Sequence, residues 1–311
     1  MIVSVVYGGK EEAEASAKNA KDIADVLSSR GYSVHLLEFS RDIISTLKEL
    51  GTEAVYVCVQ GKGYGDGTLQ GMLEHEGIPF TGSGMRAACL INDKILCKLL
   101  FDRAGIPTPK WDILTKKQFS QGDYPFEEFG FPFLAKAPTQ GRSYGIEIIR
   151  SMNDIPRIKN VFAFDNPIMI ERFIKGKNYT VGFYESSCQV VTLPIGDIID
   201  LSKDENAEDD LSILSTGECT VKECDLPQEL AEDVIRTARK VFDVTGAKGL
   251  ARVDFMLNET EQIPYVLEIN AIPSLKRVSL MPGEAALAGI VYEDMIEDIL
   301  KSAFQEELSN V

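Results

Sequence analysis

The stretch that decides the fold reads Arg252-Val253-Asp254-Phe255-Met256-Leu257 and, after a polar gap, Tyr265-Val266-Leu267-Glu268-Ile269-Asn270. Both halves are short and rich in β-branched and aromatic residues, so the pattern predicts a β-hairpin with its loop at 258–261. Side chains two apart on a strand share a face, which places Arg252 with Asp254 and Glu268 with Asn270. The side chains expected in the core behind that polar face are Val253, Leu267 and Ile269.

The polar face of this hairpin offers two carboxylates and one carboxamide, with no His or Cys among them. Such an oxygen-only set suits a hard cation such as Mg²⁺. Without a cation, each carboxylate would repel a nearby phosphate by roughly 4 kcal/mol at an effective dielectric constant near 20. A metal site for Asp254, Glu268 and Asn270 is therefore one interpretation, and a solvated hairpin face is the other.

The composition predicts a soluble globular protein. The 311 residues are 44% hydrophobic, which is enough for about two domains with packed cores. The 32 basic and 48 acidic residues give a net charge of −16, which argues against nucleic acid and anionic membranes as partners. A phosphate ligand would then need a local basic cluster or a metal.

Cysteine usage and hydropathy indicate a cytoplasmic protein. The 6 cysteines are scattered and form no Cys-x-x-Cys pair, so we expect them to be reduced and to serve in packing. The first apolar run, 2–6, is too short for a signal-peptide core, and no apolar run approaches the roughly 18 residues of a membrane span.

The N-terminal part of the chain alternates strand and helix patterns, which is typical of a doubly wound parallel sheet. Strands are expected at 2–6, 34–37 and 54–59, and helices follow the first two of them. Ligands in such sheets bind beyond the carboxyl ends of the strands. The segments there, 8–12, 39–41 and 60–67, are mostly glycine-rich or charged, so they predict a binding rim.

The middle of the chain predicts a phosphate-binding loop. One helix is expected over 86–103, and Pro107-Thr108-Pro109 makes a stiff connector near a domain boundary. A strand over 132–137 carries Lys136 and leads into 139–145, whose glycines and hydroxyls could wrap phosphates with backbone N–H groups. No Gly-Lys-Ser/Thr opens a helix there, so the loop is not a Walker P-loop.

The last third is expected to hold two further strands, a lid and two helices. Strand 168–173 is predicted to pair with strand 179–184. The acidic segment 197–218 holds a single lysine, Lys203, and a loop of that length is usually a mobile lid or disordered. Helices should begin after Asp225-Leu-Pro-Gln228, which we expect to cap the first, and run over 292–308 at the end.

Several motifs occur in order: Gly65-Asp-Gly-Thr-Leu-Gln-Gly-Met-Leu-Glu74, Ile78-Pro-Phe-Thr-Gly-Ser-Gly84, Asn92-Asp-Lys94, Arg252-Val-Asp254 and Glu268-Ile-Asn270-Ala-Ile-Pro273. Together they resemble the D-alanine–D-alanine ligases of the ATP-grasp superfamily across nearly the whole chain. The resemblance implies an α/β fold with α+β lobes, namely an ATP-grasp fold with an N-terminal doubly wound parallel-sheet domain. The implied parts are an N-terminal domain over 1–92, a linker helix and central lobe over 93–184, and a C-terminal lobe with metal site and lid over 185–311.

The resemblance also implies an activity. Members of this family phosphorylate the carboxylate of a donor amino acid with ATP, and the amine of a second amino acid attacks the acyl phosphate. The residues at the family's phosphate and adenine positions are Lys94, Lys136, Glu171, Arg172 and Ile174. Asp254, Glu268 and Asn270 would hold two Mg²⁺ (or Mn²⁺) ions, and Arg252 would stabilise the tetrahedral intermediate.

This sequence departs from the family pattern mainly on the donor side. Gln60 replaces the usual His, Gly65 replaces a Glu, and Arg142 replaces the phosphate-loop serine, with Ser143 retained beside it as a catalytic candidate. Asn178 replaces an acidic ribose contact, and Lys203 is the best match for the catalytic lid lysine. Arg142 would pair with ATP phosphates or with an extra acidic group on a larger donor, or else lie in solvent or against the acidic lid.

Other substrate positions of the family are retained. Ser279 and Leu280 stand where the family binds the carboxylate of the second substrate. Glu12 matches the acid that faces the donor ammonium, although Glu11 or Glu14 is an alternative counterpart.

We therefore expect an ATP-dependent enzyme that joins a carboxylate to the amine of an amino acid-like small molecule, with D-alanine or another compound as donor. The alternatives are an ATP-grasp ligase of unrelated substrates, such as a hydroxy acid, and a homologue that binds nucleotide without turnover. Retention of Arg252, Asp254, Glu268 and Asn270 argues against the last of these. A homodimer is compatible with all three.

Overall fold

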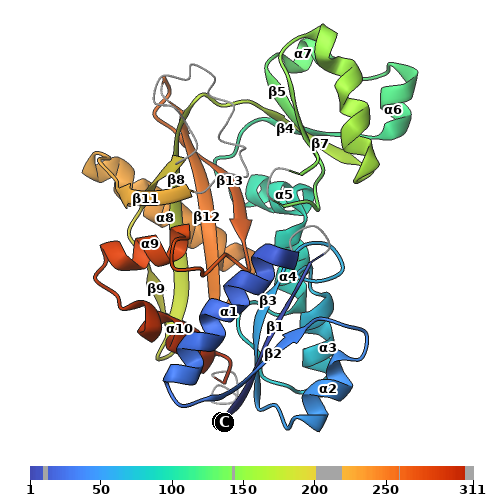
Figure 1. The fold of residues 1–311 in the computed structure, drawn as a ribbon. Helices are drawn as coiled ribbons and strands as arrows, with labels where there is room; N and C mark the ends of the chain where they lie inside the picture. The colour runs from blue at the N-terminus through green and yellow to red at the C-terminus, as the bar shows by residue number, and fades with distance from the viewer. Residues whose placement is uncertain (10–12, 142–143, 201–218, 259, 305–311) are drawn as a thin grey trace.

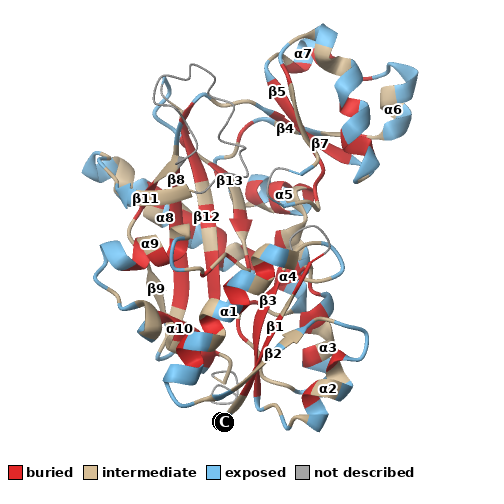
Figure 2. Cartoon of the chain, in the orientation of Figure 1, coloured by how far each residue is buried: buried red, intermediate tan, exposed pale blue. Residues whose placement is uncertain are grey.

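The computed structural model describes residues 1–9, 13–141, 144–200, 219–258 and 260–304. These residues form three sheets, each covered by helices (Figure 1). The central strands and the helix faces that pack against them are buried (Figure 2). The described part of the chain has no helix that is long and apolar enough to cross a membrane.

The first sheet is parallel and doubly wound, as the alternating pattern predicts. Its strand order is β2-β1-β3, and the strands are β1 (Ile2–Gly8), β2 (Ser33–Glu38) and β3 (Ala54–Val59). The surrounding helices are α1 (Ala13–Ser29), α2 (Ile43–Glu49) and α3 (Thr68–Glu76). Val5 on one face packs with α1, whereas Val6 on the other face packs with α2 and α3. The described residues of the predicted rim, 8–9, 39–41 and 60–67, lie at the carboxyl ends of these strands, while 10–12 lie outside the described residues.

The single helix expected over 86–103 is wrong, because the chain breaks into α4 (Met85–Asn92) and α5 (Lys94–Ala104). The break is at Asp93, which has extended backbone angles of φ −104° and ψ 108°. Its carboxylate accepts hydrogen bonds from the N–H groups of Ile95 (2.9 Å) and Leu96 (3.2 Å), and so caps α5. This cap places Lys94 at the first position of a new helix.

The second sheet forms a small lobe at the upper right of Figure 1. Its strand order is β4-β7-β5-β6, and the strands are β4 (Trp111–Leu114), β5 (Phe133–Lys136), β6 (Ile146–Ile149) and β7 (Ile168–Arg172). It is covered by α6 (Lys116–Gln121), α7 (Phe126–Phe129) and the 3₁₀ helix η1 (Met152–Ala163). Stacked and tilted aromatic rings, including Phe126 and Phe133, fill its core.

The third sheet carries the hairpin. Its strand order is β11-β10-β8-β12-β13, with β9 on the edge of β8. The strands are β8 (Gly176–Ser186), β9 (Gln189–Thr192), β10 (Gly196–Asp200), β11 (Cys219–Glu223), β12 (Leu250–Asn258) and β13 (Pro264–Asn270). Helix α8 (Gln228–Thr245) packs on one face, and α9 (Leu280–Leu287) and α10 (Tyr292–Ser302) pack on the other.

The predicted pairing of strand 168–173 with strand 179–184 is wrong. β7 pairs with β4 and β5. β8 instead pairs with β12, from Gly176 opposite Asn258 to Tyr184 opposite Leu250. The reason is that Tyr179, Val181 and Phe183 bury their side chains against α8 in the core of the large sheet. The segment between β7 and β8 is thus a crossing between two sheets and not a hairpin turn.

Three other boundaries differ from those expected. Residues 197–200 of the predicted loop belong to β10 instead, while 201–218 lie outside the described residues. Helix α8 begins after Pro227, and no side chain caps it. Helix α10 ends at Ser302, before the expected residue 308. The three-part division at residues 92 and 184 stays a prediction, and its second boundary falls within β8.

Candidate active site

The predicted hairpin is present, and its polar face has the expected composition. β12 and β13 are antiparallel, with Arg252 opposite Asn270 and Asp254 opposite Glu268. Val253 and Ile269 on the other face are 0% and 4% exposed. The apolar face thus anchors the hairpin, while the four polar side chains stand together on its other face.

Leu267 is an exception to the expected alternation. A β-bulge after Asp254 shifts the register, so that Phe255 faces Val266 and Leu267 has no opposing residue on β12. Leu267 is only partly buried and lines the cavity next to Glu268. Its predicted place in the core is therefore wrong.

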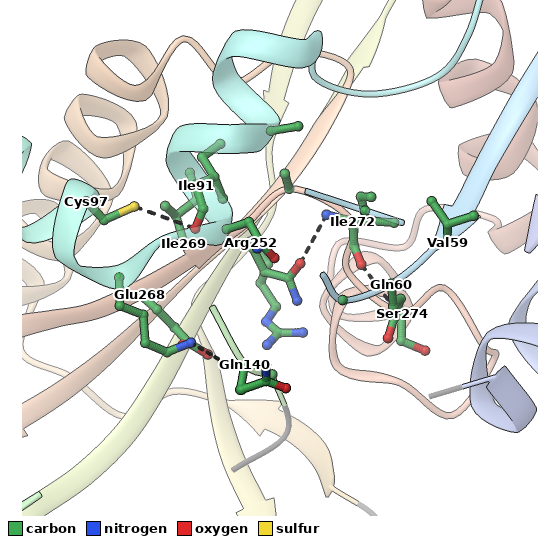
Figure 3. A pocket seen from close by; sticks show the side chains of 18 of the residues that line it. Val59, Gln60, Ile91, Cys97, Gln140, Arg252, Glu268, Ile269, Ile272 and Ser274 are labelled. Atoms are coloured by element: carbon green, nitrogen blue, oxygen red, sulfur yellow. Dashed lines mark hydrogen bonds and ion pairs between the residues drawn. The ribbon is translucent and has the colours of Figure 1, made fainter. Parts of the chain in front are cut away.

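A cavity of about 310 Å³ lies between the polar hairpin face and the rim of the first sheet (Figure 3). The predicted site residues that line it are Gln60, Lys94, Arg252, Glu268 and Asn270. The cavity is also lined by Gly65, Gln140, Leu267, Ile272 and Ser274. In Figure 3, Arg252 lies between Glu268 and Gln140 on one side and Gln60 and Ser274 on the other.

Both carboxylates of the hairpin face are paired with cations. Arg252 donates two hydrogen bonds to Asp254, of 2.8 and 2.7 Å. Lys94 lies 3.4 Å from Glu268 and donates a 2.8 Å hydrogen bond to the carbonyl of Gln140 in the predicted phosphate loop. Withdrawal from water raises the pKa of Glu268, but the charges of Lys94, Lys136 and Arg252 outweigh it, so the pKa lies below its ordinary value. Glu268 is therefore ionised at neutral pH.

A second charged cluster lies behind the cavity, in the small lobe. Glu171 on β7 is 1% exposed and forms ion pairs with Lys136 on β5 and with Lys98 on α5, the latter at 2.5 Å. Burial raises the pKa of Glu171, but the charges of Lys136 and Lys98 outweigh it, so the pKa is lowered. The sequence analysis missed Lys98, although its spacing of four from Lys94 places both lysines on one side of a helix.

The remaining predicted residues do not line the cavity. Arg172 is exposed at the end of β7, Ile174 is half-buried between β7 and β8, and Asn178 lies on β8 opposite Met256. Ser279 is the N-cap residue of α9, next to Leu280, and its hydroxyl is hydrogen-bonded to that of Ser274 at 2.7 Å. The predicted residues that lie outside the described part of the chain are Glu12, Arg142, Ser143 and Lys203.

Comparison with known proteins identifies the family. Residues 100–301 match the family described as D-ala D-ala ligase C-terminus. The chain is 34% identical to the D-alanine–D-alanine ligase of Carboxydothermus hydrogenoformans, over 96% of this chain and 97% of the relative. It is 32% identical to that of Desulforudis audaxviator, over 97% and 98%. The chain belongs to the D-alanine–D-alanine ligase family.

Membership makes the chain an ATP-dependent ligase that forms C–N bonds between small molecules. The fold agrees over the full length. A crystal structure of the D-alanine–D-alanine ligase of Bacillus anthracis complexed with ATP superposes with a TM-score of 0.84 at 27% identity, covering 100% of both chains. The expected ATP-grasp fold and the expected ligase activity are therefore confirmed.

The ligase has no room for the acidic side chain that the family pattern places at Gly65. A Cβ atom there would lie 2.9 Å from the carbonyl oxygen of Val59 and 3.0 Å from Cδ1 of Ile272. Nearby, the side-chain amide of Gln60 donates a 3.4 Å hydrogen bond to the carbonyl of Ile272. The departures at positions 60 and 65 thus lie on one edge of the cavity, where the side chain of Ile272 fills the space beside Gly65 and its carbonyl accepts the hydrogen bond from Gln60.

The ligase also buries a carboxylate that the sequence analysis missed. Glu284 on α9 is 0% exposed, and its Oε1 accepts a 3.0 Å hydrogen bond from the N–H of Gly182 on β8. Its Oε2 has no hydrogen-bond partner among the described residues. Burial raises the pKa of Glu284 well above 4.5. The positive charge of Arg252 lowers this pKa, and the negative charge of Asp254 raises it, but burial has the largest effect. Glu284 is therefore protonated in the folded chain at a pH where an exposed glutamate is ionised.

Glu284→Gln should remove a pH dependence from the stability of the ligase. Because the folded-state pKa is raised, the folded chain binds more protons than the unfolded chain above pH 4.5, so Glu284 costs stability as the pH rises towards the folded-state pKa. Between the unfolded-state and folded-state pKa values of Glu284, its contribution lowers the free energy of unfolding by about 1.4 kcal/mol per pH unit. In urea unfolding between pH 5 and pH 8, the free energy of unfolding of the variant should exceed that of the wild type by a margin that grows with pH.

The exposed carboxylate of Glu232 on α8 provides the control for this experiment. Glu232→Gln should change the free energy of unfolding by a margin that stays nearly constant with pH. If the margin for Glu284→Gln were equally constant, Glu284 would have an ordinary pKa, and the assignment of a protonated buried side chain would be wrong.

Proposed function

We propose that this ligase couples hydrolysis of ATP to the formation of a peptide bond between two amino acids, with D-alanine as the first candidate for both. The observation that carries the proposal is the hairpin face, where Arg252, Asp254, Glu268 and Asn270 stand together beside Lys94. In the proposed reaction, a carboxylate oxygen of the donor attacks the γ-phosphorus of ATP and ADP leaves. The amine of the acceptor then attacks the acyl carbon, and phosphate leaves with the donor's oxygen.

The residues of the chain support this chemistry by neutralising charge and by orienting the reactants. Phosphoryl transfer depends mainly on positioning and on compensation of phosphate charge. Lys94 contacts the predicted phosphate loop at the carbonyl of Gln140, and Lys136 is the last residue of the strand that leads into this loop; both are proposed to provide that compensation. Arg252 is placed to stabilise the oxyanion that forms when the amine adds to the acyl carbon. Exclusion of water from the cavity in the reacting complex would protect the acyl phosphate from hydrolysis.

We further propose that the hairpin face binds Mg²⁺ (or Mn²⁺), as two ions. The donor set fits a hard cation, because Asp254, Glu268 and Asn270 supply two carboxylates and an amide oxygen. Among the described residues no three His, Cys, Asp or Glu side chains converge on a metal position, so phosphate oxygens of ATP would complete the coordination. Bound Mg²⁺ would neutralise phosphate charge. Arg252 and Lys94, which now hold the two carboxylates, would then be available for the reactants.

The acceptor is proposed to bind at the N-terminus of α9. Ser279 there offers a hydroxyl, and the first N–H groups of the helix favour an anion such as a carboxylate. The donor side is less constrained, because Gly65 contributes no acid and Gln60 contributes a neutral amide. We propose that the donor is a D-amino acid or a related carboxylic acid, and that the reaction takes place in the cytoplasm. Assembly as a homodimer is also proposed.

A screen of donor and acceptor pairs tests the proposed function. With ATP and Mg²⁺, phosphate and a condensation product should form in equal amounts, and D-alanine should serve as an acceptor. Release of phosphate without a condensation product, for every pair of D- and L-amino acids and hydroxy acids, would contradict the proposal. Arg142→Ser in the same screen tests the donor preference: an unchanged preference for D-alanine would remove Arg142 from donor selection.

A further inference from the structure

We propose that Lys98 is a positioning residue of the nucleotide site, which holds the charge of Glu171 so that Lys136 can leave this carboxylate for a phosphate group. The proposal rests on the proposed function, because it takes Lys136 as a phosphate ligand. It concerns a lysine to which the family resemblance assigns no role.

Lys98 is held at the junction of the elements that surround the nucleotide site. Its side chain is 1% exposed and lies 2.5 Å from Glu171. Its ammonium group also donates to the carbonyl of Val266 at 3.2 Å and to the hydroxyl of Thr108. These contacts join α5, β7, β13 and the connector before β4, so Lys98 has no freedom to reach a ligand itself.

The cluster contains two lysines, Lys98 and Lys136, and one glutamate, Glu171, so it has one surplus positive charge when both lysines are protonated. Two ammonium groups share one carboxylate in a region where all three side chains are 9% exposed or less. By contrast, the two pairs on the hairpin face, Arg252 with Asp254 and Lys94 with Glu268, are each balanced. A buried surplus charge is costly unless an anion compensates it, so the cluster is suited to receive a phosphate.

Lys136 is the member of the cluster that can move from Glu171 towards a bound phosphate group. Its side chain is 9% exposed, compared with 1% for Lys98, and β5 leads directly from it into the predicted phosphate loop. Burial and the nearby charge of Lys136 lower the pKa of Lys98, while Glu171 opposes this. When Lys136 turns towards a phosphate, Lys98 remains to neutralise Glu171. Without Lys98, the departure of Lys136 would leave a buried carboxylate unpaired.

Titration calorimetry with ADP and with adenosine, each in the presence of Mg²⁺, tests this role. Lys98→Met should raise the Kd for ADP by about 10- to 100-fold, because Lys136 is then held by an unshared carboxylate. The Kd for adenosine, which has no phosphate, should change less than about threefold. Lys98→Met should weaken ADP binding far less in a Glu171→Gln background than in the wild type, because the carboxylate that retains Lys136 is then absent from both members of the comparison.

Two further variants keep the test decisive. Lys98→Arg retains the positive charge and should bind ADP nearly as well as the wild type, even if Lys98→Met folds poorly. Lys240→Met removes an exposed lysine that contacts the carbonyl of Ala104 at the end of α5, and should leave both affinities unchanged. If Lys98→Met weakened ADP and adenosine equally, or weakened ADP equally in the wild-type and Glu171→Gln backgrounds, Lys98 would have only a structural role. If the wild type bound no ADP, the proposed function would fail as well.

Discussion

Asp254→Asn and Glu268→Gln should each reduce turnover by roughly 10³-fold or more, because a metal-held charge contributes several kcal/mol to stabilising the transition state. The two carboxylates face each other across the hairpin, and each forms an ion pair, Asp254 with Arg252 and Glu268 with Lys94. An amide keeps the shape of either side chain but removes the negative charge that would hold the metal. Turnover is measured as phosphate release at saturating ATP and Mg²⁺.

These two substitutions should leave the fold intact. The packing of the hairpin comes from Val253 and Ile269 on its apolar face, which neither change touches. Both variants should therefore fold, with Asp254→Asn unfolding at a lower temperature than the wild type because Arg252 loses its charged partner. Asp243→Asn, which alters an exposed ion pair with Arg239 on α8, is the matched control and should retain full activity. If Asp254→Asn or Glu268→Gln kept near wild-type turnover, the assignment of the hairpin face would be wrong.

Lys136→Ala should weaken binding of ATP by about 10- to 100-fold, since a lost charge-assisted contact with phosphate costs about 1.5–3 kcal/mol. Glu171 stays paired with Lys98 in this variant, so the small lobe keeps a neutral buried pair and should remain folded. The dissociation constant of ATP is measured by calorimetry. Lys159→Ala, on the exposed side of η1 in the same lobe, is the control. An unchanged dissociation constant for Lys136→Ala would remove this lysine from the nucleotide site.

Local patterns in the sequence predict much of the fold. The period of two in the hairpin places Val253 and Ile269 inside, and the alternation of apolar strands and helices predicts the parallel N-terminal sheet. The helix break at Asp93 was missed, because an apolar period that continues through a cap resembles one long helix. Asp93 followed by the α5 sequence is an N-cap signal that could have located the break.

Long-range contacts account for the other errors. The partner of β8 is set by burial of Tyr179, Val181 and Phe183 against α8, which lies far along the chain. The bulge that exposes Leu267 to the cavity depends on how β12 and β13 are paired, and a strict alternation of side chains does not contain it. Local sequence patterns therefore predict which residues form strands, but they do not predict which strands pair in a sheet.

The candidate site shows the same division. Arg252, Asp254, Glu268 and Asn270 are close in sequence on a hairpin, so their shared face follows from strand geometry. Glu284 becomes recognisable only when α9 covers Gly182, because a glutamate on an otherwise apolar helix gives no local sign of burial. The same holds for Lys98, whose carboxylate partner Glu171 lies on another element. Functional side chains that share one hairpin can therefore be predicted from the sequence. Supporting residues on other elements, such as Glu284 and Lys98, are recognised only from the tertiary structure.

Transfer of ¹⁸O from the donor to phosphate tests the central claim most directly. The wild-type chain is incubated with ATP, Mg²⁺ and D-alanine that carries ¹⁸O in its carboxylate, and the released phosphate is analysed by mass spectrometry. If the donor carboxylate attacks ATP and the acyl phosphate is then aminolysed, each phosphate released with a dipeptide carries one ¹⁸O atom from the donor. Formation of the dipeptide with unlabelled phosphate would show that the donor is not activated as an acyl phosphate and would contradict the account.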